Sequence, residues 1–131
     1  MPLIWTDTLA TGIRQIDLQH QDLIELINAL ETAHAGGHRQ TALEEVLPRL
    51  SAYALFHFGT EEAMMGKLPA EHAERHRRQH QVFTDRVETM RQAPAANIDL
   101  AELIAYLKQW LIEHIMKTDR ELARLNALNP R

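Results

Sequence analysis

The sequence predicts an all-α protein, an antiparallel up-down-up-down four-helix bundle with an extended N-terminal arm. Apolar residues recur at the i, i+3, i+4, i+7 spacing of an amphipathic helix in four separate stretches. Short connections join these stretches, which favours antiparallel neighbours. Alternating β-branched runs and Asn-Gly turns, which would indicate strands and hairpins, are absent from the sequence.

The arm is expected over residues 1–16 and the first helix over residues 17–35. Asp17 suits the helix start, because a carboxylate at the N-cap can accept a hydrogen bond from a free backbone N–H. The apolar stripe that follows carries His20 on the same face. Gly36-Gly37 predicts the end of the helix, since glycine adopts the left-handed conformation there without strain.

The second helix is expected over residues 41–65 and the third over residues 69–91. Pro48 lies inside the second stretch, where its missing N–H predicts a kink or a later helix start. Pro69 suits the first turn of the third helix. The fourth helix is expected over residues 99–117, and a short tail at residues 120–128 is expected to add one or two helical turns.

Composition indicates a single domain over residues 1–131. Hydrophobic residues make up 45% of the chain and charged residues 24%, an ordinary globular balance. The absence of cysteine excludes disulfides, iron–sulfur ligation and cysteine nucleophiles. A net charge of −4 argues against nucleic-acid binding. Because no targeting segment and no transmembrane-length apolar run is visible, we expect a cytoplasmic protein that is not membrane-embedded. The acidic composition, without an obvious apolar surface patch, favours a monomer.

The unusual feature of the composition is its eight histidines, several of which lie on apolar stripes. His57 and Glu61 are four residues apart, as are His76 and His80, so each pair shares a helix face. The polar residues predicted on inner faces are His20, His57, Glu61, His76, His80, His114 and Asp119.

His114 and Asp119 are five residues apart, a spacing that does not share a face on an ideal helix. Five residues rotate by roughly 140° beyond one full turn. If both side chains serve one site, the helix must fray, tighten or bulge between Ile115 and Asp119.

A buried imidazole or carboxylate is costly unless it is paired or bound to a metal, so this set predicts a metal site. Neutral imidazole suits iron, zinc and copper. Seven ligands are too many for one metal. If two metals take about six positions each, with Glu61, Asp119 and one solvent oxygen bridging both, one position stays open. On a redox metal pair, an open position is where a small molecule such as O₂ would bind.

Together these residues make the chain resemble the bacterial hemerythrins. The motifs that carry the resemblance are Trp5…Gly12-Ile13…Ile16-Asp17-x-Gln19-His20, His57-Phe58-Gly59-Thr60-Glu61-Glu62, His76-x-x-x-His80 and Trp110-Leu111-x-x-His114-Ile115-x-x-x-Asp119. All four occur in order over residues 5–119. The chain departs from the family before the third helix, where Gly66-Lys67-Leu68-Pro69 lacks the tyrosine of a frequent Tyr-Pro pair. This departure bears on the turn and not on the ligands.

The resemblance implies two non-haem iron ions with a bridging oxo or hydroxo oxygen. It implies reversible O₂ binding, for transport, storage or delivery to an oxygen-consuming enzyme. Residue by residue, it assigns one iron to His76, His80 and His114 and the other, with the open position, to His20 and His57, with Glu61 and Asp119 as bridges. Trp110, Leu111 and Ile115 match positions that shape an apolar O₂ pocket in the family.

Other interpretations stay open. A zinc or manganese site is a rival, because imidazoles do not select iron by themselves. Rival functions are a di-iron enzyme acting on peroxide or NO, and an O₂- or redox-sensing module. Ferritin-like oxygenases use a pair of Glu-x-x-His motifs that this chain lacks. Iron storage would need a shell-like oligomer, which nothing in the sequence indicates.

The remaining polar residues are expected to face solvent. His34, His38 and His72 lie off the ligand pattern, so we expect them to be exposed. Glu62 is adjacent to a predicted ligand and could support a ligand from outside the site, but we favour a solvent-facing position for it. The cluster Arg75, Arg77 and Arg78 is expected to form a solvated helix face.

Overall fold

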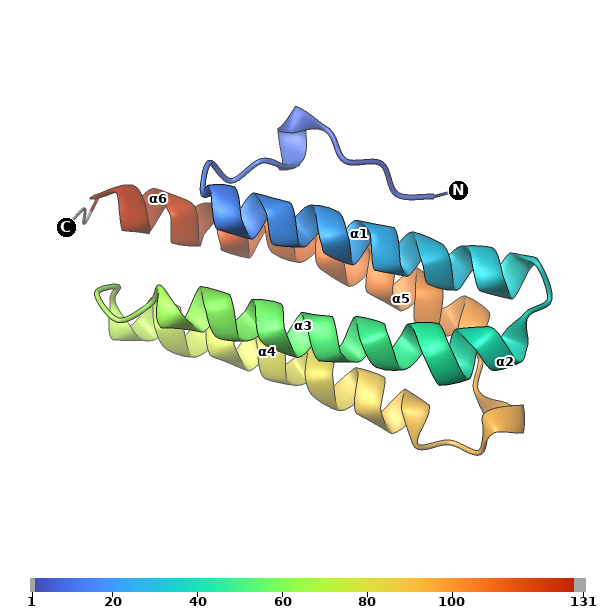
Figure 1. Ribbon diagram of the computed structural model, residues 1–131. Coiled ribbons are helices and arrows are strands. Elements are labelled where there is room, and N and C mark those ends of the chain that lie inside the picture. Colours follow the sequence, from blue (N-terminus) through green and yellow to red (C-terminus); the bar gives the residue numbers. More distant parts are fainter. Residues whose placement is uncertain (1, 129–131) are drawn as a thin grey trace.

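The computed structural model describes residues 2–128, and no strand occurs among them. Residues 1 and 129–131, the ends of the predicted domain, lie outside the described residues. The longest helices (Figure 1) are α1 (Arg14–Ala35), α3 (Leu47–Ala63), α4 (Ala70–Arg91) and α5 (Leu100–Glu113). The all-helical class predicted from the sequence is therefore confirmed.

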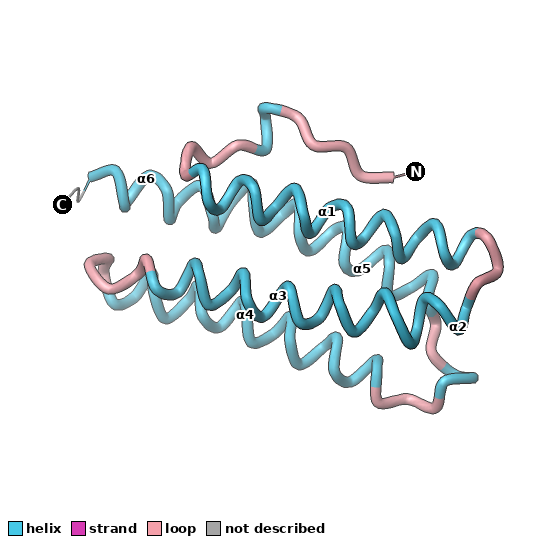
Figure 2. Tube along the Cα trace, in the orientation of Figure 1, coloured by secondary structure: helices cyan, strands magenta, loops and turns pink. Residues whose placement is uncertain are grey.

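The four long helices enclose one apolar core. Helix α1 packs against α3 and α5, and α4 packs against the same two helices. The loops between the helices lie at their ends (Figure 2). Leu30, Leu50, Val87 and Leu103 are among the buried residues that fill the interior from the four helices. Tertiary burial of such stripes, more than intrinsic propensity, stabilises helices in proteins.

Helix α1 begins at Arg14, before the start predicted at Asp17. Asp17 does not occupy the N-cap. Its carboxylate accepts hydrogen bonds from the backbone N–H groups of Thr11 (2.8 Å) and Gly12 (3.1 Å), and from the Thr11 hydroxyl (2.8 Å). Gly12 has a φ of +92°, which a residue with a side chain rarely adopts. Asp17 therefore fixes the turn before the helix from a position inside its first turn.

The chain before α1 lies along that helix (Figure 1). Asn28 pairs with Leu3 in both directions: the Leu3 N–H donates to Oδ1 at 2.9 Å, and Nδ2 donates to the Leu3 carbonyl at 2.8 Å. A single 3₁₀ turn at Asp7–Leu9 (η1) buries Leu9 in the core. These contacts attach residues 2–13 to the helices.

The second predicted helix, residues 41–65, consists of three consecutive pieces in the structure. These are α2 (Arg39–Thr41), a π-helical segment η2 (Ala42–Val46) and α3. Pro48 lies in the first turn of α3, directly after the π-helical segment. Its missing N–H falls where the regular i→i−4 ladder begins, so the conflict of a proline inside a helix is avoided. The backbone is helical from Arg39 onward, so Pro48 does not delay the helix start, and the irregularity beside it is the π-helical segment.

The other helix ends follow their local signals. α1 ends before Gly36, and Gly37 adopts a φ of +76°. Pro69 immediately precedes α4. A short 3₁₀ turn η3 (Ala95–Asn97) separates α4 from α5, and the Asp99 side chain caps α5 by accepting from the Glu102 N–H at 3.0 Å. None of the helices in residues 2–128 has the length and apolar character of a membrane span.

Helix α5 continues into a π-helical segment η4 (His114–Asp119) and then into α6 (Arg120–Leu128). The deformation predicted between Ile115 and Asp119 is confirmed as this segment. An i→i+5 ladder widens the helix, so that five residues complete about one turn. The fourth helix, predicted to end at residue 117, therefore runs on through the segment into α6, which buries Leu122.

Substitution of Leu103 tests how much the apolar core contributes to the free energy of unfolding. Its side chain is 0% exposed, so Leu103→Ala should lower the free energy of unfolding by about 2–5 kcal/mol through lost burial and a residual cavity. Leu55→Ala is the matched control, because Leu55 is 57% exposed and should cost no more than about 0.5 kcal/mol. Urea unfolding of both variants at equal metal content measures the difference. Equal losses would contradict this description of the core.

Candidate metal centre

The structure brings together all seven polar residues predicted on inner faces. The seven-residue cluster comprises His20 from α1, His57 and Glu61 from α3, His76 and His80 from α4, and His114 and Asp119 from η4. Each of these side chains is at most 4% exposed. Such complete burial of imidazoles and carboxylates needs compensation by hydrogen bonds or by a cation.

Local helix geometry positions the cluster. His57 with Glu61, and His76 with His80, lie one turn apart on regular helices and point to the same side. His114 and Asp119 are brought to one side by the π-helical segment between them. Four separate helical elements therefore contribute donors to one volume.

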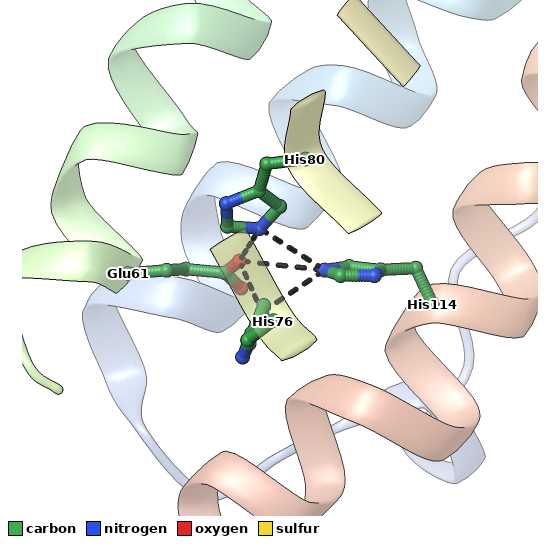
Figure 3. Close-up of side chains that lie close together, drawn as sticks. All are labelled: Glu61, His76, His80 and His114. Atoms are coloured by element: carbon green, nitrogen blue, oxygen red, sulfur yellow. Dashed lines mark hydrogen bonds and ion pairs between the residues drawn. The ribbon is translucent and has the colours of Figure 1, made fainter. Parts of the chain in front are cut away.

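The first part of the cluster is the three-histidine group, formed by Glu61, His76, His80 and His114. Figure 3 shows these four side chains pointing toward one another. Oε1 of Glu61 lies 3.2 Å from Nε2 of His76 and 2.9 Å from Nε2 of His80. Nε2 of His114 lies 3.1 Å from Nε2 of His76 and 3.2 Å from Nε2 of His80.

The second part is the two-histidine group, formed by His20, His57, Glu61 and Asp119. Here the other carboxylate oxygen of Glu61, Oε2, lies 3.3 Å from Nε2 of His57 and 3.7 Å from Nε2 of His20. Oδ2 of Asp119 lies 2.9 Å from Nε2 of His20. The two groups are therefore adjacent and share Glu61, with one oxygen turned to each.

Asp119 also reaches both groups. While Oδ2 faces His20, Oδ1 lies 3.1 Å from Nε2 of His76 and 3.1 Å from Nε2 of His114. Each carboxylate of the cluster thus has one oxygen on either side. This is the arrangement that a carboxylate bridging two metal ions requires.

The donor atoms fit metal ions better than they fit one another. Several buried atoms have no hydrogen-bond partner among the described residues: Nε2 of His20 and His57, Oε2 of Glu61, and both oxygens of Asp119. In the three-histidine group, three Nε2 atoms crowd together, and protons on all of them would collide. Two ligand atoms bound at right angles about 2.1 Å from one metal lie about 3 Å apart, which matches the spacings here.

Electrostatics in the metal-free cluster favours ion pairs. Burial lowers the pKa of His20, but the carboxylates of Asp119 and Glu61, as hydrogen-bond acceptors and negative charges, outweigh burial and raise that pKa to about 9. The pKa of His114 is likewise raised to about 9, by the same two carboxylates against burial. Burial raises the pKa of Glu61, yet hydrogen bonds from the surrounding histidines hold it well below its ordinary value. Without metal, protons take the place of the cations.

The outward ring nitrogens of three cluster histidines also have partners. Nδ1 of His57 lies 2.7 Å from Oε1 of Gln19, and Nδ1 of His80 lies 2.9 Å from Oε2 of Glu62. Nδ1 of His114 lies 3.0 Å from Oε1 of Gln79. A donating Nδ1–H leaves Nε2 free to face the site. The prediction that Glu62 faces solvent is therefore only partly right, because its side chain is 35% exposed but its carboxylate accepts a hydrogen bond from His80. The adjacency of Glu62 to Glu61 was a signal for this contact that we weighed less than exposure, and the adjacency of Gln79 to His80 was a signal that we did not use.

The exposed position predicted for His72 is wrong. His72 is 4% exposed and its Nδ1 lies 3.2 Å from Oε1 of Glu121. It lies one turn before His76 on the same face of α4, and the buried residues Ala73 and Leu122 pack beside this end of the bundle. His34 and His38 are exposed, as predicted.

An apolar cavity of about 10 Å³ adjoins the cluster. His57 and His114 line one side of it, and Trp110 and Leu111, two of the predicted pocket residues, lie in its wall. Trp110 also stacks on the His114 ring, with centroids 4.4 Å apart. Ile115 is fully buried but does not line this cavity. The remaining wall consists of Leu23, Ile27, Leu50, Ala54, Phe58, Phe83 and Leu107.

Comparison with known proteins points to one family. The family model of the hemerythrin HHE cation binding domain matches residues 11–125. A bacteriohemerythrin of Pseudomonas paraeruginosa is 37% identical over 118 residues, covering 89% of this chain and 76% of that protein. A bacteriohemerythrin of Stenotrophomonas maltophilia is 36% identical over 122 residues, covering 92% and 79%. A hemerythrin-like protein of Naegleria gruberi is 27% identical over 118 residues, covering 90% and 88%. The matched region contains the whole seven-residue cluster.

The raised pKa values predict how the metal-free protein responds to pH. His20 and His114 have a pKa near 6.5 when unfolded and about 9 when folded, so their stabilising contribution is complete below pH 6.5 and is lost as pH rises through 9. The carboxylates are ionised throughout this interval. We expect the melting temperature of chelator-treated protein to fall from pH 6.5 to pH 9.

Metal-loaded protein is the control for this prediction. Histidines bound to a metal would stay neutral over the same interval, so this contribution to the pH dependence should disappear. Melting curves at matched ionic strength measure both forms. A metal-free melting temperature that rises between pH 6.5 and pH 9 would contradict the assigned ion pairs.

Proposed function

Because the chain belongs to the hemerythrin family, we propose that it binds O₂ reversibly at a pair of iron ions held by the seven-residue cluster. His76, His80 and His114 would hold one iron, and His20 and His57 the other. Glu61 and Asp119 would bridge the two. Iron supplies the redox chemistry and the affinity for O₂ that no side chain of this chain possesses.

The single observation that carries the proposal is the pairing of the donors. Glu61 and Asp119 each turn one carboxylate oxygen to the three-histidine group and the other to the two-histidine group. The five histidines are divided three to two between the groups. The division leaves the two-histidine group with fewer protein donors than its neighbour. The position available to a small ligand would therefore lie beside His20 and His57.

The surroundings of that position support a binding role rather than catalysis. The cavity beside His57 is lined by apolar side chains and by two cluster histidines, so no free acid or base stands there. Trp110, Leu111 and Ile115 would form the family's O₂ pocket in this chain. Apolar walls keep water and protons from the bound gas and so favour its release unchanged.

The proposal includes the finer features expected from the sequence. We take the helices as an up-down-up-down bundle with residues 1–16 as an arm, and the protein as a cytoplasmic monomer. The bound O₂ would serve transport, storage or supply to an oxygen-consuming enzyme. A bridging oxo or hydroxo oxygen would complete the iron pair.

The experiment that tests this function is metal analysis with a visible spectrum recorded under argon, then air, then argon again. We expect two irons per chain and a charge-transfer band that appears with O₂ and fades when O₂ is removed. A band that never reverses would favour redox enzymology, and zinc in place of iron would contradict the proposal.

A pair of histidine variants shows whether the cluster binds the iron. His57→Ala should lower the iron content from two toward one per chain and abolish the reversible band, because the two-histidine group then retains a single imidazole. His38→Ala is the matched control, since His38 is exposed and does not belong to the seven-residue cluster. Equal iron content in both variants would exclude His57 as a ligand.

Leu111 tests the apolar cavity. Leu111→Ser places a hydroxyl and room for water in the wall of the cavity, so the O₂-bound spectrum should decay about tenfold faster, equivalent to about 1.4 kcal/mol of barrier. Leu111→Met keeps the wall apolar and should decay at the wild-type rate. Spectra followed over time in air measure both. Unchanged decay in the serine variant would argue against protection by this cavity.

A further inference from the structure

The five cluster histidines differ in what their outward nitrogens contact. Nδ1 of His57 and of His114 contact amide oxygens, those of Gln19 and Gln79. Nδ1 of His20 and His76 are buried without a hydrogen-bond partner among the described residues. Of the five cluster histidines, His80 alone has a carboxylate partner for this nitrogen among residues 2–128, that of Glu62. The three-histidine group and the two-histidine group therefore differ in the partners of their outward nitrogens as well as in their numbers of histidines.

The contact between Glu62 and His80 is well formed. With Nε2 turned to the three-histidine group, Nδ1–H of His80 donates to Oε2 of Glu62 at 2.9 Å. His80 is 3% exposed, whereas Glu62 is 35% exposed and its other oxygen lies 3.8 Å from Nε of Arg77. A negative charge at the protein surface is thereby connected by one hydrogen bond to an imidazole inside the site.

The orientation of the His80 ring does not depend on Glu62 alone. The ring of Phe58 stacks on it with centroids 4.0 Å apart and an interplanar angle of 12°. This contact keeps the ring in place when the charge of its partner changes. Glu62 therefore differs from an amide partner chiefly in its charge.

A carboxylate partner changes an imidazole ligand in a way that an amide does not. A hydrogen bond to an ionised acceptor is roughly twice as strong as a neutral one, and it shifts the Nδ1 proton toward the acceptor. The imidazole becomes more basic and donates more electron density through Nε2. More density, together with a nearby negative charge, favours the more highly charged ion at that nitrogen.

We propose that Glu62 is a positioning residue that, through its hydrogen bond to His80, strengthens this imidazole as a ligand and biases the metal of the three-histidine group toward its oxidised state. This inference rests on the proposed iron pair. It assigns the two irons different potentials, with the oxidised state favoured at the three-histidine group. Electrons would then be held preferentially at the two-histidine group, beside the position proposed for O₂.

The first test is Glu62→Gln, which keeps an oxygen acceptor for His80 and removes the charge. We expect the ratio of Fe³⁺ to Fe²⁺ affinity to fall about tenfold, the lower end for loss of such a partner. This equals a rise of about 59 mV in the midpoint potential for a one-electron step. A merely structural defect would weaken both oxidation states alike and leave the potential unchanged.

A swap within the same group provides the matched variant. Gln79 is exposed and contacts His114, another ligand of the three-histidine group, which Trp110 holds by stacking. Gln79→Glu should lower the midpoint potential. The double variant E62Q/Q79E restores one carboxylate partner to the group and should return toward the wild-type value.

The control for overall charge is Glu74→Gln. Glu74 lies on the same helix as His80, is 72% exposed, and bonds to Arg78 rather than to a ligand. Its loss removes one negative charge without touching the cluster, so the potential should not move.

Spectroelectrochemical titration of the iron-loaded proteins separates the outcomes. A rise in E62Q, a fall in Q79E, recovery in the double variant and no change in E74Q would support the inference. Equal potentials in wild type and E62Q would overturn it, as would an equal shift in E74Q. If E62Q does not fold, an unchanged potential in Q79E overturns it. A wild-type protein that takes up no iron would overturn the proposed function itself, which the metal analysis reveals separately.

Discussion

The constraint on which the structure depends is the complete burial of seven polar side chains that point toward one another. They are at most 4% exposed, and several of their polar atoms have no hydrogen-bond partner among the described residues. In the metal-free state, the carboxylates of Asp119 and Glu61 outweigh burial and raise the pKa of His20 and His114 to about 9, so that protonated histidines supply the positive charge. Metal ions would supply it with better geometry, because each ion satisfies several donors at once.

The helices are adapted to this requirement where regular geometry would fail. A regular α-helix would turn His114 and Asp119 to different faces, and the π-helical segment corrects this by widening one turn. The continuation into α6 then brings Leu122 and Glu121 over the end of α4, beside His72. The geometry of the cluster and the packing at this end of the bundle therefore arise from one local departure from the α-helix. Stacked rings, Phe58 on His80 and Trp110 on His114, hold two of the cluster histidines in their orientation.

Local spacing was sufficient to predict the all-helical class, the convergence of the seven side chains and the deformation before Asp119. These features follow from the spacing of residues within each helix, which the local sequence shows directly. Contacts between residues of different helices were harder to predict from the sequence. Glu62 meets His80 only because α3 and α4 lie side by side. His72 is buried where α6, the helical tail predicted at residues 120–128, packs beside the start of α4. Asp17 was misplaced as a cap because its partners, Thr11 and Gly12, precede the helix in a turn that periodicity does not describe.

The central claim is that the cluster holds two metal ions that share Glu61 and Asp119. Anomalous diffraction at the iron absorption edge, from crystals of the iron-loaded protein, tests it most directly. The account predicts two iron peaks, one within bonding distance of His76, His80 and His114 and the other of His20 and His57. Both peaks should contact the two carboxylates, with one oxygen on each side. A single peak, or two peaks that do not share a carboxylate, would contradict the account.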